Sequence, residues 1–570
     1  MKTEQNIPSQ NKRRFVLLLL FVVIVGLLMW RVVYLQVFNK DFLQDQGSAR
    51  HLRTVSIAAH RGMIMDRHGE ALAISTPVES IWVNPSLLVN QRQMLPKLMR
   101  ILELDLEQTE QMLATRMDRE FVYLKRHVNP DIAKKVLDMQ IEGVFAQREY
   151  RRYYPAGEVV SHVIGFTNID DEGQEGIELS YEDWLKGTPG KKRVIKDRLG
   201  RVIEDVESIR TSSPGKNIHL SIDRRIQYLA YRELKTAMKL NKARSGSAVM
   251  LDVKTGEILA AVNQPSYNPN GRKNMRSSQF RNRAVTDVFE PGSTIKPFTI
   301  AMALESKKYK PDTIIDTTPG TLKVGRNTIR DAKNYGKLDV THVITKSSNV
   351  GASKIALSMD AERMWSMFNR LGFGVVTASG FPGESAGLLS HFSRWHDIEQ
   401  ATLSFGYGLS VTPLQLAHAY SILAADGVSR PVSFIRQDKP VAGEQVLPAK
   451  VVRDVREMMK TVISDEGTGI LASVHGYQVA GKTGTIHKSA AGGYSNDRYI
   501  AVFAGMAPAS DPRLVLIVMV NDPAGEQYYG GQVAAPVFSR VMSGALRLMD
   551  IAPDNLPVMQ TNLQLNKERS

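Results

Sequence analysis

A serine and a lysine three residues apart, Ser293 and Lys296, form the first group in the sequence that could do chemistry. The segment Phe289-Glu-Pro-Gly292 predicts a turn that delivers Ser293 to the start of a helix. Three-residue spacing places both side chains on one helix face, where an unprotonated amine can accept the hydroxyl proton and activate the serine as a nucleophile. The same spacing recurs elsewhere in the chain, so this pair alone does not identify a site.

Two further polar groups follow in the same half of the chain. Ser347 and Asn349 supply a hydroxyl and an amide, a pair that can relay a proton and hold a substrate amide. Lys482-Thr-Gly-Thr485 lies on a predicted strand, where a cation and a hydroxyl can face a carboxylate while Gly484 allows close backbone approach. Each pattern is weak by itself. Only their occurrence together, in this order and in one predicted domain, gives the set weight.

Composition narrows the chemistry. The 570-residue chain has no cysteine, which excludes disulfides, thiolate metal sites and a cysteine nucleophile. A chain without thiols is suited to an oxidising compartment, because it cannot form wrong disulfides there. The formal charge of +15, from 73 Lys and Arg against 58 Asp and Glu, admits nucleic acid, an anionic membrane or an anionic polymer as a neighbour.

The N-terminus predicts a membrane anchor. Phe15 to Trp30 is an unbroken apolar run, and extension through Leu35 gives a helix long enough to cross a bilayer. A cleaved signal peptide is the alternative, but no small-residue cleavage site follows the run. Because Lys12, Arg13 and Arg14 precede it, the positive-inside rule places the first residues in the cytoplasm and everything after about residue 37 outside.

The rest of the chain must position these three motifs. Before a Ser/Pro/Gly linker at 210–217 the segment is charged and broken by turns, with a strand at Ser80–Val83 and a helical stretch at Gln91–Leu113. Two strands early and three late in the following domain predict one antiparallel sheet split in sequence, with helices inserted between its halves. The expected strands are Gly246–Leu251, Glu257–Val262, Gln478–Thr485, Tyr499–Met506 and Leu514–Asn521, and the expected helices include Thr294–Leu304, Pro413–Ala425 and Ala535–Met549.

Taken together, the three motifs resemble those of penicillin-binding proteins and class A β-lactamases. The similarity to class B penicillin-binding proteins, and among them to the division-specific peptidoglycan transpeptidases, covers nearly the whole chain. It rests on Arg61-Gly-Met-Ile-Met-Asp-Arg67, Arg152-Tyr-Tyr-Pro-Ala-Gly157, Gly176-Ile-Glu178, Tyr267-Asn-Pro-Asn270, Asp287-Val-Phe-Glu-Pro-Gly-Ser-Thr294, Lys346-Ser-Ser-Asn-Val-Gly351, Phe405-Gly-Tyr-Gly-Leu-Ser410 and Tyr528-Tyr-Gly-Gly531.

This resemblance implies an α+β architecture. A single N-terminal transmembrane helix would be followed by an elongated α+β pedestal of the dimerisation type and a transpeptidase domain of the penicillin-binding and serine β-lactamase kind. That domain would hold an antiparallel sheet with helices on both faces and a helical subdomain. The expected limits are a cytoplasmic tail at 1–14, the anchor at 15–36, the pedestal at 37–217, the transpeptidase domain at 218–552 and a disordered tail at 553–570.

The resemblance also implies a role for each motif residue. Ser293 would attack the D-Ala-D-Ala carbonyl of a stem peptide with Lys296 as its base, while Ser347 and Asn349 assist proton transfer and hold the donor peptide. After D-Ala leaves, the amine of a neighbouring stem peptide would resolve the acyl-enzyme and form the cross-link. β-Lactams would mimic the donor and acylate Ser293. Lys482 is expected to take part in the same catalytic group.

The substrate contacts follow by the same resemblance. Lys482 and Thr483 would bind the terminal carboxylate next to Gly484, and the backbone N–H groups of Ser293 and Thr485 would form the oxyanion hole. Three aromatic side chains are candidates for the wall of the cleft, although ordinary packing explains them equally well. They are Tyr407, Tyr528 and Tyr529. No metal and no cofactor is expected.

Other functions remain open to different degrees. A bifunctional class A protein would carry a Glu-Asp-x-x-Phe signature, which is absent, and a carboxypeptidase or β-lactamase would lack the long region 37–210. An elongation-type class B enzyme shares the architecture, although the neighbourhoods of Tyr267 and Phe405 favour division. A β-lactam sensor and a catalytically silent divisome scaffold are the alternatives outside enzymes. A sensor would normally need extra membrane spans and a cytoplasmic effector, for which fourteen N-terminal residues leave little room. A scaffold would be free to lose its nucleophile, yet Ser293, Lys296 and Lys482 are all present.

The resemblance places the protein in the bacterial inner membrane, as a single-pass chain with a cytoplasmic N-terminus and a periplasmic catalytic domain. The partners it implies are peptidoglycan stem peptides and nascent glycan strands, a polytopic SEDS-type (FtsW-like) glycosyltransferase, other divisome proteins, and β-lactams as inhibitors. The positive charge is then better explained by anionic cell-wall or lipid surroundings than by nucleic acid.

Overall fold

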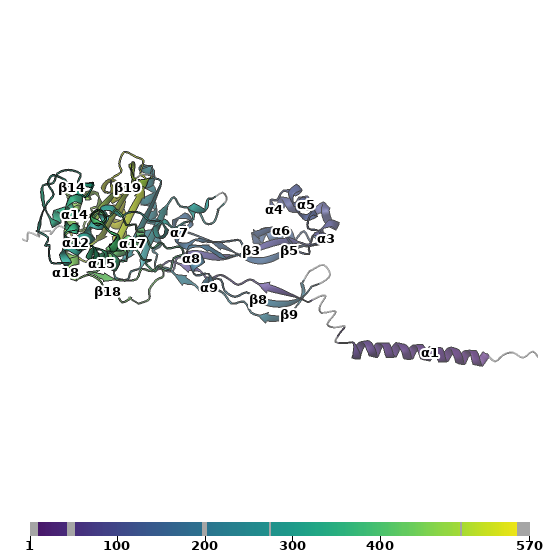
Figure 1. Ribbon diagram of the computed structural model, residues 1–570. Coiled ribbons are helices and arrows are strands. Elements are labelled where there is room, and N and C mark those ends of the chain that lie inside the picture. The colour runs from purple at the N-terminus through teal and green to yellow at the C-terminus, as the bar shows by residue number, and fades with distance from the viewer. Residues whose placement is uncertain are drawn as a thin grey trace, which may run out of the picture. The chain divides into compact units, whose positions relative to one another are not determined.

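A computed structural model describes residues 10–40, 42, 52–196, 202–272, 275–439, 441–490 and 493–555 (Figure 1). The chain forms two compact units that interleave in sequence. The first comprises the residues up to 60 with 77–150 and 187–214, and the second comprises 61–76, 151–186 and the residues from 215 onward. The segments 61–76 and 151–186, part of the predicted pedestal, thus belong to the second unit. Residues 1–9 of the predicted cytoplasmic tail and 556–570 of the predicted disordered tail lie outside the described residues.

The predicted anchor is a continuous helix. Helix α1 (Gln10–Val33) continues into a π-helical turn, η1 (Tyr34–Phe38). Residues Arg13–Phe38 are apolar and long enough to cross a membrane, because 26 residues of helix span about 39 Å against about 30 Å of hydrocarbon. Their side chains are exposed in this chain, as a lipid-facing helix requires.

The first unit contains a small three-stranded antiparallel sheet and a helical lobe. The sheet has the order β1-β8-β9, from β1 (Leu52–Ile57), β8 (Gly190–Lys196) and β9 (Val202–Arg210). In the lobe, the end of the long strand β3 (Ala71–Val83) pairs with β4 (Val122–Val128) and β5 (Val144–Tyr153). Its helices are α3 (Pro85–Leu88), η2 (Val89–Met94), α4 (Leu95–Leu102), α5 (Leu106–Ala114) and α6 (Pro130–Leu137).

The helical stretch predicted at Gln91–Leu113 is present, but it is divided between η2, α4 and α5. Glu103 adopts a left-handed conformation with φ = 53° and ends α4, because an L-residue in this conformation cannot continue a right-handed helix. Asp105 then starts α5, and its carboxylate accepts the Gln108 N–H at 2.8 Å. The predicted strand Ser80–Val83 is present as the end of β3.

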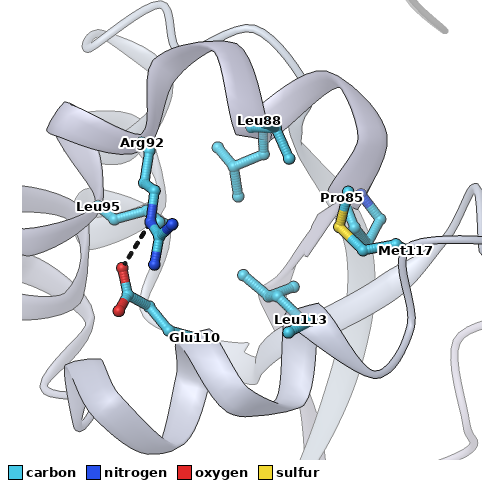
Figure 2. A pocket seen from close by; sticks show the side chains of 9 residues that line it. Pro85, Leu88, Arg92, Leu95, Glu110, Leu113 and Met117 are labelled. Carbon is cyan, nitrogen blue, oxygen red and sulfur yellow. Dashed lines mark hydrogen bonds and ion pairs between the residues drawn. The ribbon is translucent and has the colours of Figure 1, made fainter.

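An apolar pocket of about 130 Å³ separates α3 and η2 from α5 (Figure 2). Arg92 Nε lies 3.1 Å from Glu110 Oε1, and this ion pair joins the two sides of the pocket. The other lining residues are Pro85, Leu88, Val89, Leu95, Leu113, Ala114 and Met117.

The second unit begins with short elements around a buried ionic group. Glu178 is fully buried and lies 2.7 Å from Arg61 Nε and 2.6 Å from Arg152 Nε. One carboxylate paired with two guanidinium groups satisfies charges that would be costly to bury alone. The elements are β2 (Ile64–Met65), η3 (Gly157–Val159), α7 (Ser161–Ile164), β6 (Phe166–Thr167), β7 (Gly173–Glu175), α8 (Gly176–Ser180), α9 (Glu182–Leu185) and β10 (Ile218–His219).

The prediction of one antiparallel sheet split in sequence is confirmed. Five strands pair in the order β12-β11-β21-β20-β19, with all neighbours antiparallel. β19 lies at one edge, the edge that carries the Lys482 motif. The strands are β11 (Ser245–Asp252), β12 (Ile258–Gln264), β19 (Ala480–Ala490), β20 (Gly493–Ala507) and β21 (Leu514–Asn521).

Both faces of this sheet are covered by helices, which explains why its strands are almost continuously apolar. On one face, α10 (Arg224–Leu240) and α20 (Ala535–Leu548) pack on Met250 and Val518. On the other, η5 (Gly292–Ile295), α12 (Lys296–Glu305) and α17 (Pro413–Ala424) join the core around Val249. Alternate residues of one strand therefore belong to two separate cores.

The residues between the two halves of the sheet form a helical subdomain next to α12 (Figure 1). Its largest core members are fully buried aromatic side chains, among them Phe298, Phe368 and Phe373. The elements are η4 (Ser277–Gln279), α11 (Arg283–Thr286), β13 (Ile314–Asp316), β14 (Thr321–Val324), β15 (Asn327–Arg330), β16 (Lys337–Asp339), α13 (Val340–Thr345), α14 (Asn349–Leu357), α15 (Ala361–Arg370), η6 (Phe392–Arg394), α16 (Asp397–Leu403), β17 (Val428–Ser429), β18 (Glu444–Gln445), α18 (Ala449–Lys460), η7 (Thr461–Ile463) and η8 (Ile470–Ala472). The short helix α19 (Gly530–Val533) follows β21 and contacts β19 and β20.

Candidate active site

Ser293 lies in the 3₁₀ turn η5, which runs directly into α12. The turn is fixed from two sides: the Gly292 N–H donates to the Gly406 carbonyl at 3.0 Å, and Tyr420 Oη donates to the Thr294 carbonyl at 2.8 Å. A Cβ on Gly406 would lie 2.1 Å from the Gly292 carbonyl oxygen, and its φ is +88°. Only glycine permits this close approach, which holds the serine turn against the 405–408 segment.

The Lys296 amine is the centre of the group. It is fully buried, and its Nζ lies 3.0 Å from Ser293 Oγ, 3.1 Å from Ser347 Oγ and 2.8 Å from Asn349 Oδ1. A fourth contact, 2.6 Å long, is with the Ser347 carbonyl. The structure therefore brings together four of the side chains that the sequence singled out, on segments more than 50 residues apart.

Ser347 is held in an uncommon conformation. Its φ is +58°, a value that costs about 1 kcal/mol or more for a residue with a Cβ. This conformation lies between the end of α13 and the start of α14, and it turns both oxygen atoms of Ser347 toward the Lys296 amine. The strained backbone at Ser347 thus helps to hold the Lys296 amine in place.

Asp331 fixes the start of α14. Its carboxylate accepts Ser348 Oγ–H at 2.6 Å and the N–H groups of Asn349 and Val350 at 2.5 and 3.0 Å. An anionic group at this position satisfies N–H groups that have no partner within the helix and complements its dipole. Since Asn349 begins α14, the aspartate orients the amide that contacts Lys296.

The electrostatics favour a neutral amine at Lys296. Burial lowers its pKa well below the usual lysine value, the positive charge of Lys482 lowers it further, and only Asp331 opposes them. Burial also lowers the pKa of the Lys482 amine to about 7. Two buried amines in one site cannot both be protonated without an anion between them. When Lys296 is neutral and Lys482 is protonated, the Lys296 amine can accept a proton and the Lys482 ammonium can bind a carboxylate.

Strand β19 presents its motif on two faces. A Cβ on Gly484 would lie 3.0 Å from Thr294 Cγ2, and Ile486 packs against Gly292, so the even-numbered residues face the serine turn. Thr483 and Thr485 point to the opposite face because side chains alternate along a strand. There, Thr483 Oγ1 lies 2.6 Å from Thr468 Oγ1, and the Gly530 N–H donates to Thr485 Oγ1 at 2.9 Å.

One aromatic wall is tied to the serine turn. Tyr407 Oη accepts the His487 N–H at 3.2 Å, and its ring meets that of Tyr494 edge to face at 5.1 Å between centroids. Tyr494 Oη donates to Glu290 Oε1 at 3.0 Å, and this carboxylate also accepts the Gly408 N–H at 2.8 Å. Glu290 lies three residues before the serine, so it connects the β19–β20 hairpin to the nucleophile loop.

The other two predicted tyrosines form a separate stack. Tyr528 lies parallel to Tyr499 of β20, with 4.2 Å between ring centroids, and its hydroxyl is 3.1 Å from that of Tyr529. The Tyr529 side chain is about half exposed. The stack contacts β20, and no hydrogen bond between it and the Ser293 group is found among the described residues. Across all the residues that the structure describes, no cluster of three or more His, Asp or Glu side chains is placed to hold a metal ion.

Several site residues carry no signal in the sequence. Asp331 and Thr468 each contact a motif residue, yet neither belongs to one of the motifs quoted above. Glu290 lies within the motif at 287–294, but the sequence predicts no chemical role for it. Asp331 follows a short strand 17 residues before Ser348, and its role depends on a hairpin that no local periodicity predicts. Glu290 stands inside the predicted turn before Ser293, where an acidic residue would ordinarily be considered solvated.

Comparison with known proteins agrees with this geometry. Residues 246–543 match the family described as penicillin-binding protein transpeptidase domain, and residues 56–220 match the penicillin-binding protein dimerisation domain. The chain is 45% identical to the peptidoglycan D,D-transpeptidase FtsI of Escherichia coli K12 over 94% of this chain and 92% of that protein. It is 42% identical to the probable peptidoglycan D,D-transpeptidase PenA of Neisseria gonorrhoeae over 96% of this chain and 94% of that protein.

Solved structures show the same fold. The transpeptidase domain of Burkholderia pseudomallei penicillin-binding protein 3 is 43% identical, with a TM-score of 0.55 over 59% of this chain and 98% of that one. A peptidoglycan synthetase from Bifidobacterium adolescentis, 24% identical, aligns with a TM-score of 0.71 over 89% of this chain and 98% of its own. The second likeness concerns the fold alone.

Proposed function

The chain belongs to the class B penicillin-binding proteins, and we propose from this premise that it is a peptidoglycan D,D-transpeptidase in which Ser293 is the nucleophile and Lys296 its base. The observation that carries the assignment is the buried Lys296 amine, 3.0 Å from Ser293 Oγ. Its surroundings favour the neutral form, which can accept the serine proton. The E. coli relative is named for the same activity.

Acylation follows from this geometry. Ser293 Oγ attacks the carbonyl carbon of the penultimate D-Ala as its proton passes to Lys296 Nζ. The tetrahedral oxyanion is stabilised by the backbone N–H groups of Ser293 and Thr485. The C–N bond to the last D-Ala then breaks, and the leaving amine takes a proton from Lys296 through Ser347, which lies 3.1 Å from the amine. D-Ala departs, and an ester on Ser293 remains.

Lys482 supplies the charge for the donor carboxylate. It is fully buried, and its hydrogen bonds are with Thr483 O at 3.2 Å and Thr483 Oγ1 at 3.4 Å, which leaves its charge without an anion among the described residues. A bound carboxylate would compensate that charge and raise the pKa of the amine again. Asn349 would hold the donor peptide, as the family resemblance implies; its Oδ1 accepts from Lys296, and its Nδ2 donates to the Arg330 carbonyl at 3.1 Å. Thr483, whose Oγ1 lies 3.4 Å from Lys482 Nζ, would complete the carboxylate contacts.

Transfer to the acceptor reverses these steps. The amine of a neighbouring stem peptide attacks the ester carbonyl, loses a proton to the Lys296 amine, and forms the new peptide bond as Ser293 Oγ leaves and regains its proton. Tyr407, Tyr528 and Tyr529 would line the groove in which the two peptides lie, with Gly484 allowing the donor backbone to approach β19. β-Lactams would acylate Ser293 by the first half of the same route.

We further infer that the protein acts at the division septum, from the inner membrane. The relatives named FtsI support the division role, and the apolar helix Arg13–Phe38 supports the anchor. The basic residues before the helix support a cytoplasmic N-terminus and a periplasmic catalytic domain. An FtsW-like glycosyltransferase and other divisome proteins are the proposed partners of the anchor and the pedestal, whose limits we propose as 15–36 and 37–217.

A reconstituted cross-linking reaction tests the enzymatic proposal. The full chain in detergent is given a pentapeptide-bearing glycan strand and an acceptor amine, and released D-Ala and cross-linked product are quantified. Both products are expected from the parent and neither from Ser293→Ala. A catalytically silent scaffold would release no D-Ala in either case, whereas release without cross-linking, with water as acceptor, would indicate a carboxypeptidase.

A further inference from the structure

A strongly basic pocket opens at one end of the five-stranded sheet, on strands across the sheet from the motif strand β19. It has a volume of about 580 Å³ and lies where β11 and α11 begin and β12 and β21 end. Four arginines line it, with one carboxylate among them. These residues are Arg244, Arg276, Arg281, Arg283 and Asp287.

The arginines exceed the available acidic groups. Asp287 pairs with Arg281 at 2.9 Å and lies 3.9 Å from Arg283, whereas no acidic partner of Arg244 or Arg276 is found among the described residues. Burial lowers the pKa of Arg283, and the positive charges of Arg281 and Arg244 lower it further against the opposing effect of Asp287. The pocket thus carries an uncompensated positive charge.

One guanidinium group in the pocket is incompletely bonded. Arg283 is largely buried; its Nη2 donates to the Ser278 carbonyl at 3.1 Å, while its Nη1 is buried without a hydrogen-bond partner among the described residues. A buried donor without an acceptor is unfavourable, and a guanidinium fork fits a carboxylate or phosphate in particular. An anionic ligand would satisfy both the donor and the charge.

Strand register gives the distance from this pocket to the active site. Ser245 of β11, which lines the pocket, pairs with Asn521, Asn521 with Ile500, and Ile500 with Ile486 of β19. Ile486 packs against Gly292, next to the nucleophile. The pocket therefore lies at the level of the serine turn, three strand spacings or about 14 Å across the sheet. A peptide of about four or five extended residues spans that distance.

Polar groups continue from the hairpin toward the pocket. Lys488 of β19 donates to Asn521 Oδ1 at 2.8 Å, and Asn521 Nδ2 donates to Ser245 Oγ at 2.9 Å. Burial lowers the pKa of Lys488, and Arg498 and Arg244 lower it further against the opposing effect of Asp522. Asp522 lies 3.6 Å from Lys488 and 2.5 Å from Arg498, so it compensates part of the positive charge at the hairpin base. A chain of hydrogen bonds thus connects the hairpin base with the pocket, whose own excess of positive charge comes from its arginines.

We propose that this pocket is an exosite for the carboxylates of peptidoglycan, and that it holds a stem peptide of the glycan strand other than the one that acylates Ser293. This proposal rests on the function proposed above. A glycan strand repeats its stem peptides and their carboxylates along its length, so it can place one peptide along β19 and a second anion 14 Å away. An anionic lipid headgroup shares part of this chemistry, but the register relation to β19 favours the polymer substrate.

A binding experiment with the active site blocked tests the exosite. The full chain in detergent is first acylated with penicillin, and the affinity of fluorescent glycan strands with uncross-linked stem peptides is then measured by anisotropy. Arg244→Gln with Arg276→Gln is expected to weaken binding about tenfold, because charge-assisted hydrogen bonds are lost. The matched control is Arg363→Gln with Arg394→Gln, two exposed arginines of the same domain outside the pocket, which is expected to retain the parent affinity.

Two further arms identify the ligand. Strands whose carboxylates are converted to amides should bind about as weakly to the parent as intact strands bind to the double variant. Equal affinity of parent and double variant, or of intact and amidated strands, would overturn the exosite. Displacement of strands by phosphatidylglycerol micelles but not by free stem peptide would overturn it in favour of a lipid site. Labelling of Ser293 by penicillin in the same samples tests the transpeptidase proposal separately.

Discussion

Replacement of Asp331 by asparagine tests how the structure positions the catalytic group. The carboxylate accepts three hydrogen bonds at the start of α14, from Ser348, Asn349 and Val350. An amide offers one oxygen, and its NH₂ group faces donors, so at least one charge-assisted bond is lost at about 1.5–3 kcal/mol. Removal of the anion from the helix N-terminus adds about 0.5–1 kcal/mol.

We therefore expect Asp331→Asn to destabilise the start of α14 by about 2–4 kcal/mol in total. Displacement of Asn349 should lower the second-order rate constant of acylation about 10- to 100-fold, since small misplacements of a catalytic group have effects of this size. The variant also removes the one charge that raises the pKa of Lys296. The acidic limb of the rate profile, where Lys296 loses its proton, should consequently move to lower pH.

The assay is stopped-flow acylation by a fluorescent penicillin between pH 5 and 9, together with thermal unfolding. Asp339→Asn is the matched control, because Asp339 caps the neighbouring helix α13 by accepting the His342 N–H at 2.7 Å and has no contact with Lys296. A parent-like rate with an unmoved acidic limb for Asp331→Asn would refute the reasoning. An equal shift of the acidic limb in the Asp339→Asn control would also refute it.

Three further changes separate the parts of the site. Lys482→Met should slow acylation about 10²- to 10³-fold, because the donor carboxylate loses its partner, and should raise Tm by roughly 2–4 °C because a buried amine is removed. In the parent, the pKa of Lys482 is about 7, below the value of 10.5 in the unfolded chain. Because Lys482 loses its charge above pH 7, acylation by an anionic penicillin should become slower there. Between pH 7 and 10.5 the unfolded chain binds more protons than the folded one, so the free energy of unfolding should rise with pH. Chemical denaturation across this range measures the slope, and a flat slope would contradict the burial of a protonatable amine. Gly406→Ala should cost at least about tenfold in acylation rate, because its methyl group would lie 2.1 Å from the Gly292 carbonyl, and parent-like kinetics would show that the serine turn tolerates displacement. Tyr494→Phe removes the hydrogen bond with Glu290 and should loosen the β19–β20 hairpin, so faster hydrogen exchange at the hairpin is expected with a modest loss in acylation, and unchanged exchange would contradict the proposed tie.

The sequence was sufficient for the sheet and for the central motif residues. Strands such as Leu514–Asn521 are continuous apolar runs because helices cover both faces of the sheet, and such runs are visible without a structure. Ser293, Lys296, Ser347 and Asn349 could be grouped because their short patterns, each weak alone, occur in the order known from penicillin-binding proteins. Their mutual distances come only from the folded chain.

The remainder depended on contacts that local patterns do not encode. The break at Glu103 reflects a single left-handed residue, which the apolar periodicity of the flanking helices conceals. Asp331 follows a hairpin strand 17 residues before Ser348, and no local pattern predicts that the two residues meet. The Lys482 motif likewise does not indicate which of its side chains face the serine turn, because this depends on how β19 lies in the folded sheet. The basic pocket is assembled from four separate segments of the chain. Three of its arginines form a visibly basic stretch at 276–283, but the sequence does not show that Arg244 and Asn521 close a pocket with them.

Mapping of the penicillin adduct tests the central claim most directly. The full chain is treated with penicillin at pH 7, and the modified residue is identified by peptide mass spectrometry, with Ser293→Ala and Lys296→Ala treated in parallel. We predict one penicilloyl ester on Ser293 of the parent, none on Ser293→Ala, and acylation slowed by about 10³-fold or more in Lys296→Ala, which retains the serine without its base. An adduct on any other residue, or undiminished labelling of Ser293→Ala, would contradict the account.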